Sequence, residues 1–216
     1  MKETKKRIFL AAGAFLAFAL WTALVCLVDV RAIGPRGSSV GLATLNGAVH
    51  ALFGVHFSLY IITDLLGLVP VAVGFGFALL GLFQWIRRKS LFRVDQSLFV
   101  LGAFYIVMLA AYLFFEAAPI NYRPVLISGF LEVSYPSSTT LLVLCVMPTA
   151  EMQLSSRIKS TTLRRCVSIA IYAFTAFMVI ARLVSGVHWC SDIIGGALLS
   201  ASLVALYSAC VTAKDI

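Results

Sequence analysis

The chain has 216 residues, of which 61% are hydrophobic and only 12% are charged, and its mean hydropathy is +1.00. Soluble domains contain about 45–50% apolar and about 25% charged residues, so this composition excludes a soluble enzyme, a secreted disulfide scaffold and a disordered chain. Most of the chain is expected to lie in lipid, where a net charge of +8 indicates orientation and not a nucleic-acid partner.

Six stretches are long and apolar enough to cross the hydrocarbon core, which takes roughly 20 residues per helix. These expected spans are residues 8–28, 61–86, 98–115, 137–154, 166–184 and 189–211. A mixed stretch, residues 42–59, carries Asn46, His50 and His56 and is expected to form an interfacial or partly buried helix. The sequence therefore predicts an all-α integral membrane protein with six transmembrane helices in a single domain, residues 1–216.

Lysine and arginine are distributed unequally between the two sides that these spans define. Thirteen fall on the side of both termini: Lys2, Lys5, Lys6, Arg7, Arg87, Arg88, Lys89, Arg93, Arg157, Lys159, Arg164, Arg165 and Lys214. Only four fall on the opposite side: Arg31, Arg36, Arg123 and Arg182. Because cytoplasmic loops are enriched in Lys and Arg, we expect a multi-pass protein of the cell (inner) membrane with both termini in the cytoplasm.

Polar residues that are costly at membrane depth gather on the outer side of this topology. They fall in three segments, residues 116–124, 134–140 and 182–192. The segments are far apart in the sequence, but the topology derived from charge places all three on one face. We therefore expect a functional site that faces the non-cytoplasmic side.

His188 and Asp192 are four residues apart at the start of the last span, so they share one face of a helix. A carboxylate there holds the imidazole in one tautomer and stabilises it when it becomes positive. That arrangement suits a histidine that acts as a base or a nucleophile. A purely structural His–Asp pair at a helix end is the alternative.

Arg123 and Arg182 offer planar, multi-donor groups for phosphate oxygens, with snorkelling to lipid headgroups as the alternative. Ser137 and Ser138 open the fourth span, where free N–H groups and the helix dipole attract anions; ordinary capping is the alternative. Together these residues indicate a phosphate site beside a histidine. The five cysteines show no metal-ligand spacing, and neither a metal nor another cofactor is expected.

The three segments resemble the motifs of the type 2 phosphatidic acid phosphatase (PAP2) superfamily, which is related to the vanadium haloperoxidases. The family pattern is K-x6-R-P, then P-S-G-H, then S-R-x5-H-x3-D. This chain retains Arg123-Pro124, Pro136-Ser137 and Arg182-x5-His188-x3-Asp192. The resemblance covers nearly the whole chain and implies a six-helix bundle that hydrolyses a membrane lipid phosphate or diphosphate, such as an isoprenyl diphosphate or a phosphatidic-acid-like lipid, without a metal.

The resemblance also implies a role for each retained residue. His188 would be the nucleophile that takes the phosphoryl group as a phosphohistidine, and Asp192 would orient it. The phosphate oxygens would be held by Arg123, Arg182, Ser137 and backbone N–H groups near Ser138. These groups would stabilise the charge that spreads onto the phosphoryl oxygens in the transition state.

Two positions depart from the family pattern. Glu116 stands where the first motif has its lysine, and Thr139 stands where the second motif has the histidine that protonates the leaving group. Loss of a general acid typically costs about 10²–10⁴-fold in rate, and a carboxylate in place of the lysine repels phosphate unless it is protonated or paired. Ser138 also replaces the glycine of the second motif.

Three interpretations follow from these departures. In the first, the enzyme works with a leaving group that needs little protonation or with another acid, for which the candidates are Glu116, Glu132, Tyr122 and Tyr135. In the second, Glu116 pairs with Arg123 or a cationic headgroup, and the protein transfers headgroups between lipids. In the third, catalysis is lost and the fold binds lipid.

Asp64 is a further ionisable residue, near the outer end of the second span. It is expected either to face the cavity of the phosphate site or to serve as a cap or water-exposed residue.

Overall fold

The computed structural model describes residues 2–212, which are mainly helical. The long helices are α1 (Lys2–Leu27), α4 (Leu68–Arg88), α5 (Gln96–Ala117), α6 (Ser138–Ser155), α7 (Thr161–Val184) and α8 (Cys190–Thr212). The shorter elements are α2 (Ala43–Phe53), α3 (Phe57–Leu66) and the 3-10 turns η1 (Pro35–Gly37) and η2 (Leu91–Arg93). The prediction of an all-α membrane protein is confirmed. Lys214, which was assigned to the side of both termini, lies outside the described residues.

Five segments of the described chain are long and apolar enough to cross a membrane. They are Lys2–Leu27, Phe57–Arg88, Gln96–Ala117, Thr161–Val184 and Cys190–Val211. The expected fourth span corresponds to α6, which is not among them, so the predicted number of six is approximate. α6 has 18 residues and packs against α4, α5, α7 and α8. Because neighbouring helices shield it, α6 tolerates polar side chains that a lipid-facing helix would expose.

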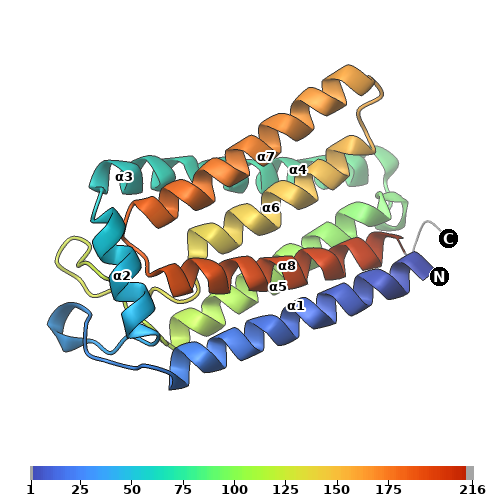
Figure 1. Cartoon of the computed structure of the whole chain (residues 1–216). Helices are drawn as coiled ribbons and strands as arrows, with labels where there is room; N and C mark the ends of the chain where they lie inside the picture. The colour runs from blue at the N-terminus through green and yellow to red at the C-terminus, as the bar shows by residue number, and fades with distance from the viewer. Residues whose placement is uncertain (1, 213–216) are drawn as a thin grey trace.

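The bundle core lies along α6. Leu141, Val143 and Cys145 are buried on it, and Leu199 and Tyr207 of α8 join the same core. α1 packs along α8 on one side, and α7 packs against α6 on the other, so the helices run roughly along one another in Figure 1. The apolar side chains left exposed on the outer helices are those that lipid would cover.

The expected helix over residues 42–59 is wrong in extent. α2 ends at Phe53, and the chain turns at Gly54, whose φ of +69° favours glycine. α3 then begins at Phe57, earlier than the predicted start of the second span. Asn46, expected on an interfacial or partly buried helix, is completely buried. Its polar atoms are satisfied there, since its amide donates to Gly41 O over 2.7 Å and its Oδ1 accepts from Ser191 N over 3.0 Å.

The second span is divided into α3 and α4 at Gly67. Pro70, in the first turn of α4, has no N–H to donate to the carbonyl of Leu66, and its ring crowds that carbonyl. The regular helix is interrupted there, and the chain continues as one membrane segment, Phe57–Arg88. α3 carries Thr63 and Asp64, which contact Arg182 near the site.

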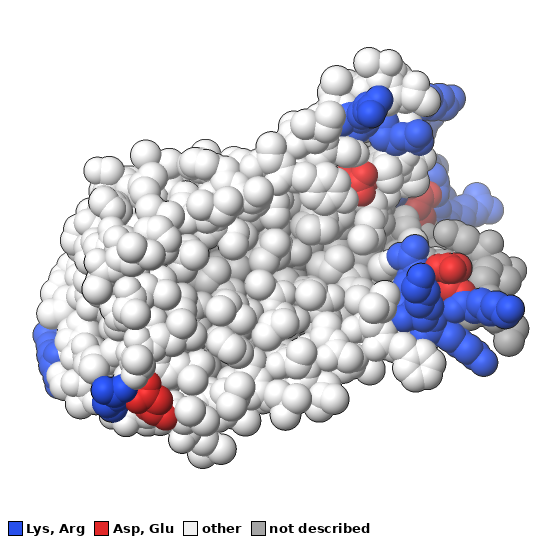
Figure 2. All heavy atoms as spheres, viewed as in Figure 1, with Lys and Arg blue, Asp and Glu red and all other residues white. Residues whose placement is uncertain are grey.

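The two ends of the bundle differ in charge. Figure 2 shows most of the visible Lys and Arg side chains at the end where both termini lie. The opposite end is formed by α2, the loop 118–137 and the turn 185–189, and it holds the three polar segments named above. The structure thus brings the three segments to the same end of the molecule.

Candidate active site

The turn between α7 and α8 positions His188. Gly186 has a φ of +67°, and a Cβ there would lie 1.9 Å from Gly54 O. His56 N donates to Ser185 O over 2.9 Å, which holds the turn against the segment that precedes α3. His188 is only 3% exposed as a result.

A serine lies between His188 and Asp192. Ser134 Oγ is 2.9 Å from His188 Nδ1 and donates to Asp192 Oδ2 over 2.5 Å, whereas Nδ1 and Oδ2 are 3.9 Å apart. Because the hydroxyl has one proton and gives it to the carboxylate, it accepts the Nδ1–H of the imidazole. This arrangement fixes the tautomer that leaves the Nε2 lone pair free. Sequence reasoning placed Ser134 in the second polar segment but gave it no role.

The carboxylate of Asp192 is completely buried and fully hydrogen-bonded. Asn121 Nδ2 donates to Oδ1 over 3.1 Å, and Trp189 N donates to Oδ2 over 3.0 Å, in addition to the Ser134 bond. Asn121 is 1% exposed, and its own Oδ1 accepts from Gly41 N over 3.2 Å. Buried carboxylates need such partners, so Asn121 is a second site residue that sequence reasoning missed.

Nε2 of His188 is placed to act as a nucleophile. Nε2 is buried and has no hydrogen-bond partner within the described residues. The pKa of His188 is lowered to about 4, mainly by burial and also by the positive charges of Arg123 and Arg182, while Asp192 acts in the opposite direction. The imidazole is therefore neutral at pH 7, and its unpaired nitrogen carries a lone pair that is available to an electrophile.

Arg182 is 1% exposed near the end of α7. Its Nη1 donates to Thr63 Oγ1 over 3.1 Å, its Nη2 is 3.8 Å from Asp64 Oδ1, and its guanidinium carbon lies 4.9 Å from the centre of the Tyr60 ring. All three partners belong to α3. The Nε–H is buried without a partner among the described residues, so this donor remains for a ligand.

Arg123 reaches the same region from the loop 118–137. Its Nε lies 3.0 Å from Glu132 Oε2, but the N–H is not aligned with the oxygen, so the contact is an ion pair without a hydrogen bond. Its guanidinium carbon is 5.8 Å from the Tyr60 ring centre. Tyr60 therefore lies close to both arginines. Nη1 of Arg123 is buried and finds no hydrogen-bond partner among residues 2–212.

The N-terminus of α6 lies beside these groups. Ser137 is its N-cap, with Oγ accepting from Thr140 Oγ1 over 3.0 Å, and Ser137 N donates to Asp192 O over 3.0 Å. The capping alternative thus holds for the Ser137 hydroxyl. Ser138 occupies the first helical position, where backbone N–H groups have no intrahelical acceptor, and it lines two neighbouring cavities.

The smaller cavity contains the histidine. It has a volume of only about 10 Å³, which is close to that of one water molecule. Its lining includes His188, Ser134, Ser138, Tyr112 and Glu116. Glu116, the residue that replaces the family lysine, therefore stands on the histidine side of the site.

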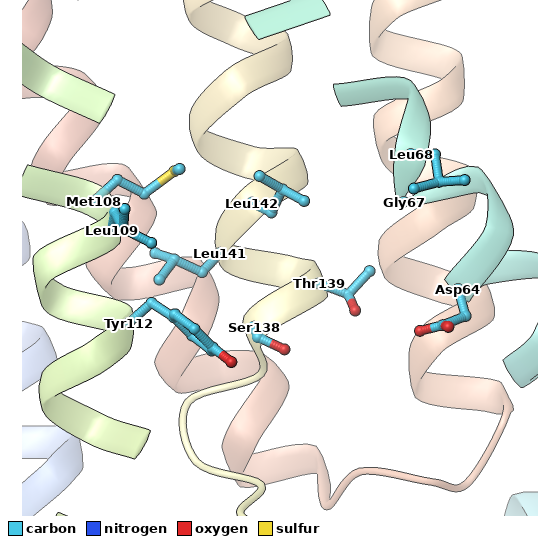
Figure 3. Close-up of a pocket in the computed structure, with 10 residues that line it drawn as sticks. All are labelled: Asp64, Gly67, Leu68, Met108, Leu109, Tyr112, Ser138, Thr139, Leu141 and Leu142. Atoms are coloured by element: carbon cyan, nitrogen blue, oxygen red, sulfur yellow. The ribbon is translucent and has the colours of Figure 1, made fainter. Parts of the chain in front are cut away.

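The larger cavity, of about 300 Å³, lies between α3, α4, α5 and α6 (Figure 3). Its apolar wall consists of Leu68, Met108, Leu109, Leu141 and Leu142, and its polar end consists of Asp64, Tyr112, Ser138 and Thr139. Tyr112, Ser138 and Leu141 line both cavities, which are therefore neighbours. Thr139, the residue that replaces the family histidine, faces the larger one.

The other candidate acids are placed differently. Tyr135 is 1% exposed, and its hydroxyl is 2.7 Å from Thr22 Oγ1; burial raises its pKa. Glu132 is paired with Arg123. Tyr122 lines neither cavity, and its carbonyl accepts from Trp189 Nε1 over 2.7 Å. Within residues 2–212, no group of three or more His, Cys, Asp or Glu side chains is arranged to hold a metal ion.

Comparisons with known proteins identify the fold and the family of the chain. A crystal structure of a transmembrane PAP2-type phosphatidylglycerolphosphate phosphatase from Bacillus subtilis superimposes with a TM-score of 0.59 at 20% identity, covering 96% of this chain and 98% of that one. At this identity the likeness concerns the fold. No match was found among curated proteins. The sequence profile of the PAP2 superfamily matches residues 97–216, more than half of the chain, and the protein therefore belongs to the PAP2 superfamily.

Proposed function

We propose that this protein is a membrane lipid phosphatase that hydrolyses a lipid phosphate or diphosphate through a phosphohistidine at His188. The observation that carries the proposal is the buried, unpaired Nε2 of His188, which is held by Ser134 and Asp192 and lies near two arginines that also have unpaired N–H groups. Three unpaired nitrogen groups from three parts of the chain are costly unless a ligand satisfies them. The oxygens of a phosphoryl group would accept from the N–H groups of the two arginines, and its phosphorus is an electrophile for the Nε2 lone pair.

In the first step, the Nε2 lone pair attacks phosphorus while the bond from phosphorus to the leaving oxygen breaks. Arg123, Arg182 and the first N–H groups of α6 stabilise the charge on the phosphoryl oxygens. Asp192 stabilises the positive imidazole through the Ser134 hydroxyl. In the second step, water attacks the phosphohistidine and inorganic phosphate leaves. The arginines and the helix end supply the positive charge, so the proposed reaction needs no metal.

A lipid substrate is supported by the larger cavity. Its polar end meets the histidine cavity at Ser138, and its wall is otherwise formed by leucine and methionine side chains of α4, α5 and α6 (Figure 3). A phosphate at Ser138 would leave its hydrocarbon chain against this wall. The phosphatase from Bacillus subtilis that shares the fold also acts on a lipid phosphate, according to its description.

The proposal includes the orientation of the protein in the membrane. The excess of Lys and Arg at the end with both termini supports a cytoplasmic location for that end. The site end then faces the non-cytoplasmic side of the cell membrane. Substrate would be taken from the outer leaflet, at headgroup depth.

Phosphate release from a panel of lipid phosphates and diphosphates tests the function. Purified protein is assayed in detergent or vesicles with and without EDTA, beside His188→Ala and the control His56→Ala, whose exposed ring contacts only Phe53 O among the hydrogen bonds of the structure. We expect EDTA-resistant release that His188→Ala abolishes and His56→Ala retains. Equal inactivity of the wild type and His188→Ala across the panel would contradict the proposal, and label on an acceptor lipid would favour headgroup transfer.

A further inference from the structure

The carboxylate of Asp64 lies near Thr139, the residue that replaces the family histidine. Asp64 and Thr139 line the same cavity, and Figure 3 shows their side chains turned toward one another from α3 and α6. Asp64 Oδ1 is 3.8 Å from Arg182 Nη2, so the carboxylate also borders the group expected to hold phosphate. Asp64 therefore lines the cavity and also lies next to Arg182, which is expected to bind the phosphate.

The two neighbouring cavities place His188 and Asp64 in different parts of the site. His188 lines the smaller cavity, Asp64 lines the larger one, and Ser138 at the N-terminus of α6 belongs to both. In a phosphoryl transfer, the attacking and leaving atoms are roughly in line across phosphorus. A phosphoryl group at Ser138 with His188 on one side therefore has its other side open to the cavity that contains Asp64. Water that hydrolyses a phosphohistidine arrives from that second side.

Other acidic groups near the site are unsuited to activate this water. Asp192 is fully hydrogen-bonded by Ser134, Asn121 and Trp189 N, and Glu132 lines neither of the two cavities. Glu116 lines the smaller cavity together with His188, so it stands on the side of the nucleophile. Asp64 is the carboxylate that lines the larger cavity within the described part of the chain.

We propose that Asp64 is the general base of the second step, a role that rests on the phosphohistidine mechanism proposed above. The water oxygen attacks phosphorus, the P–Nε2 bond breaks, and the electron pair of that bond returns to His188. The water proton passes to the carboxylate of Asp64, which later releases it to solvent. Inorganic phosphate leaves through the same cavity, and atoms and charge balance without a further reactant.

This role predicts that the two steps respond differently to Asp64→Asn. The amide cannot accept the proton, so hydrolysis of the phosphohistidine should slow by about 10²–10⁴-fold. Attack by His188 needs no base and should proceed. With a diphosphate lipid labelled in the terminal phosphate, the variant should accumulate labelled protein that survives an alkaline quench and is lost in acid, while lipid monophosphate appears in one burst.

Four further variants complete the experiment. Asp64→Glu should retain part of the turnover, because it keeps a carboxylate, and Asp29→Asn, at an exposed ion pair with Arg31, should behave as wild type. Asp64→Asn combined with Thr139→His should regain turnover, because an imidazole on the same cavity wall would accept the proton. His188→Ala should take up no label. Thermal unfolding of each variant checks that the fold is kept.

The outcomes separate the two proposals. Turnover of Asp64→Asn within twofold of an active wild type would overturn the base role and leave the phosphatase intact. Slow turnover without accumulation of labelled protein would also overturn it, because loss of the Arg182 contact alone would slow the first step. An inert wild type would overturn both proposals.

Discussion

Ser134 Oγ lies 2.5 Å from Asp192 Oδ2, and the same oxygen is 2.9 Å from His188 Nδ1. The carboxylate therefore acts on the imidazole through a hydroxyl and not by direct contact. Such a bridge has a directional requirement, because the serine proton must point to Asp192 for its lone pair to accept from the histidine. Loss of the hydroxyl would leave the imidazole free to adopt the wrong tautomer.

Ser134→Ala should lower kcat while changing KM little. Removal of one partner from a buried, charge-assisted bond costs about 1–3 kcal/mol, which corresponds to roughly 5- to 150-fold in rate if it is expressed in the first step. Ser134→Thr should restore part of the rate because it retains the hydroxyl. Steady-state kinetics on the lipid substrate measures the effect.

Ser202→Ala is the matched control for that variant. Ser202 is 6% exposed on α8 and donates to Ala11 O over 3.0 Å, so its loss removes a buried serine bond away from the site. We expect lower thermal stability with unchanged kcat. A rate for Ser134→Ala equal to that of Ser202→Ala would contradict the bridging role.

The pH dependence should follow the low pKa of His188. The imidazole is neutral above about pH 4, so protonation of His188 should not lower kcat/KM between neutral pH and about pH 5. As the pH falls through 4, His188 becomes protonated and kcat/KM should decrease, which gives the acid limb of the pH profile. Arg123→Gln removes one of the charges that lower this pKa, so the acid limb should move to higher pH. Arg36→Gln, at an exposed arginine that donates to Gly129 O over 2.9 Å, should leave the limb in place.

The same pKa has a consequence for stability. The ordinary value is 6.5 and the folded value is about 4, so between these values the unfolded chain binds a proton that the folded chain does not. The contribution of His188 to the free energy of unfolding is therefore largest above pH 6.5 and falls as the pH decreases through 4. An acid limb at the same pH in wild type and Arg123→Gln would contradict this account.

Gly195→Ala should disturb the loop that carries Ser134. A Cβ at Gly195 would lie 2.6 Å from the Tyr135 ring, and Tyr135 is buried next to Ser134. Overpacking of this kind costs about 1–3 kcal/mol, so thermal unfolding in detergent should shift down and kcat should fall. Gly102→Ala on α5, where a Cβ meets nothing within 4 Å, should be neutral or slightly stabilising. Equal unfolding temperatures for both variants would refute the packing argument.

Asn121→Asp should impair the site more than Asn121→Ala. The asparagine donates to Asp192 Oδ1 over 3.1 Å, and a carboxylate in its place would set two negative charges against each other in a buried environment. We expect lower stability and a reduced kcat for both, with the aspartate variant recovering partly at low pH as one carboxyl is protonated. An aspartate variant as active as wild type at pH 8 would show that Asn121 does not orient Asp192.

Single cysteines would determine the orientation. In a background without the native cysteines, Phe130→Cys, at a residue that is 72% exposed in the loop 118–137, should react with a membrane-impermeant maleimide in intact cells. Lys159→Cys, between α6 and α7, should react only after permeabilisation. The reverse pattern would place the site in the cytoplasm.

The sequence was sufficient to predict the helical membrane fold and the convergence of three segments, because apolar length and motif spacing are properties of local sequence. It was not sufficient for Ser134 and Asn121, whose contacts are made across more than 50 residues. For Asp64 it left two possibilities open, and the structure places this residue in the lining of the larger cavity. The buried state of Asn46 was missed for the same reason. The predicted number of six spans is approximate, because α6 packs among the other helices and is less apolar than the five candidate spans of the described chain.

The hydrogen bond from Ser137 N to Asp192 O joins the first turns of α6 and α8. This bond restrains the distance between the helix end expected to bind the anion and the residue that holds His188 through Ser134. A cavity of about 10 Å³ must nevertheless widen to admit a phosphoryl group. Tyr112 and Glu116 of α5 line this cavity, so a phosphoryl group that enters it would displace these side chains or their neighbours.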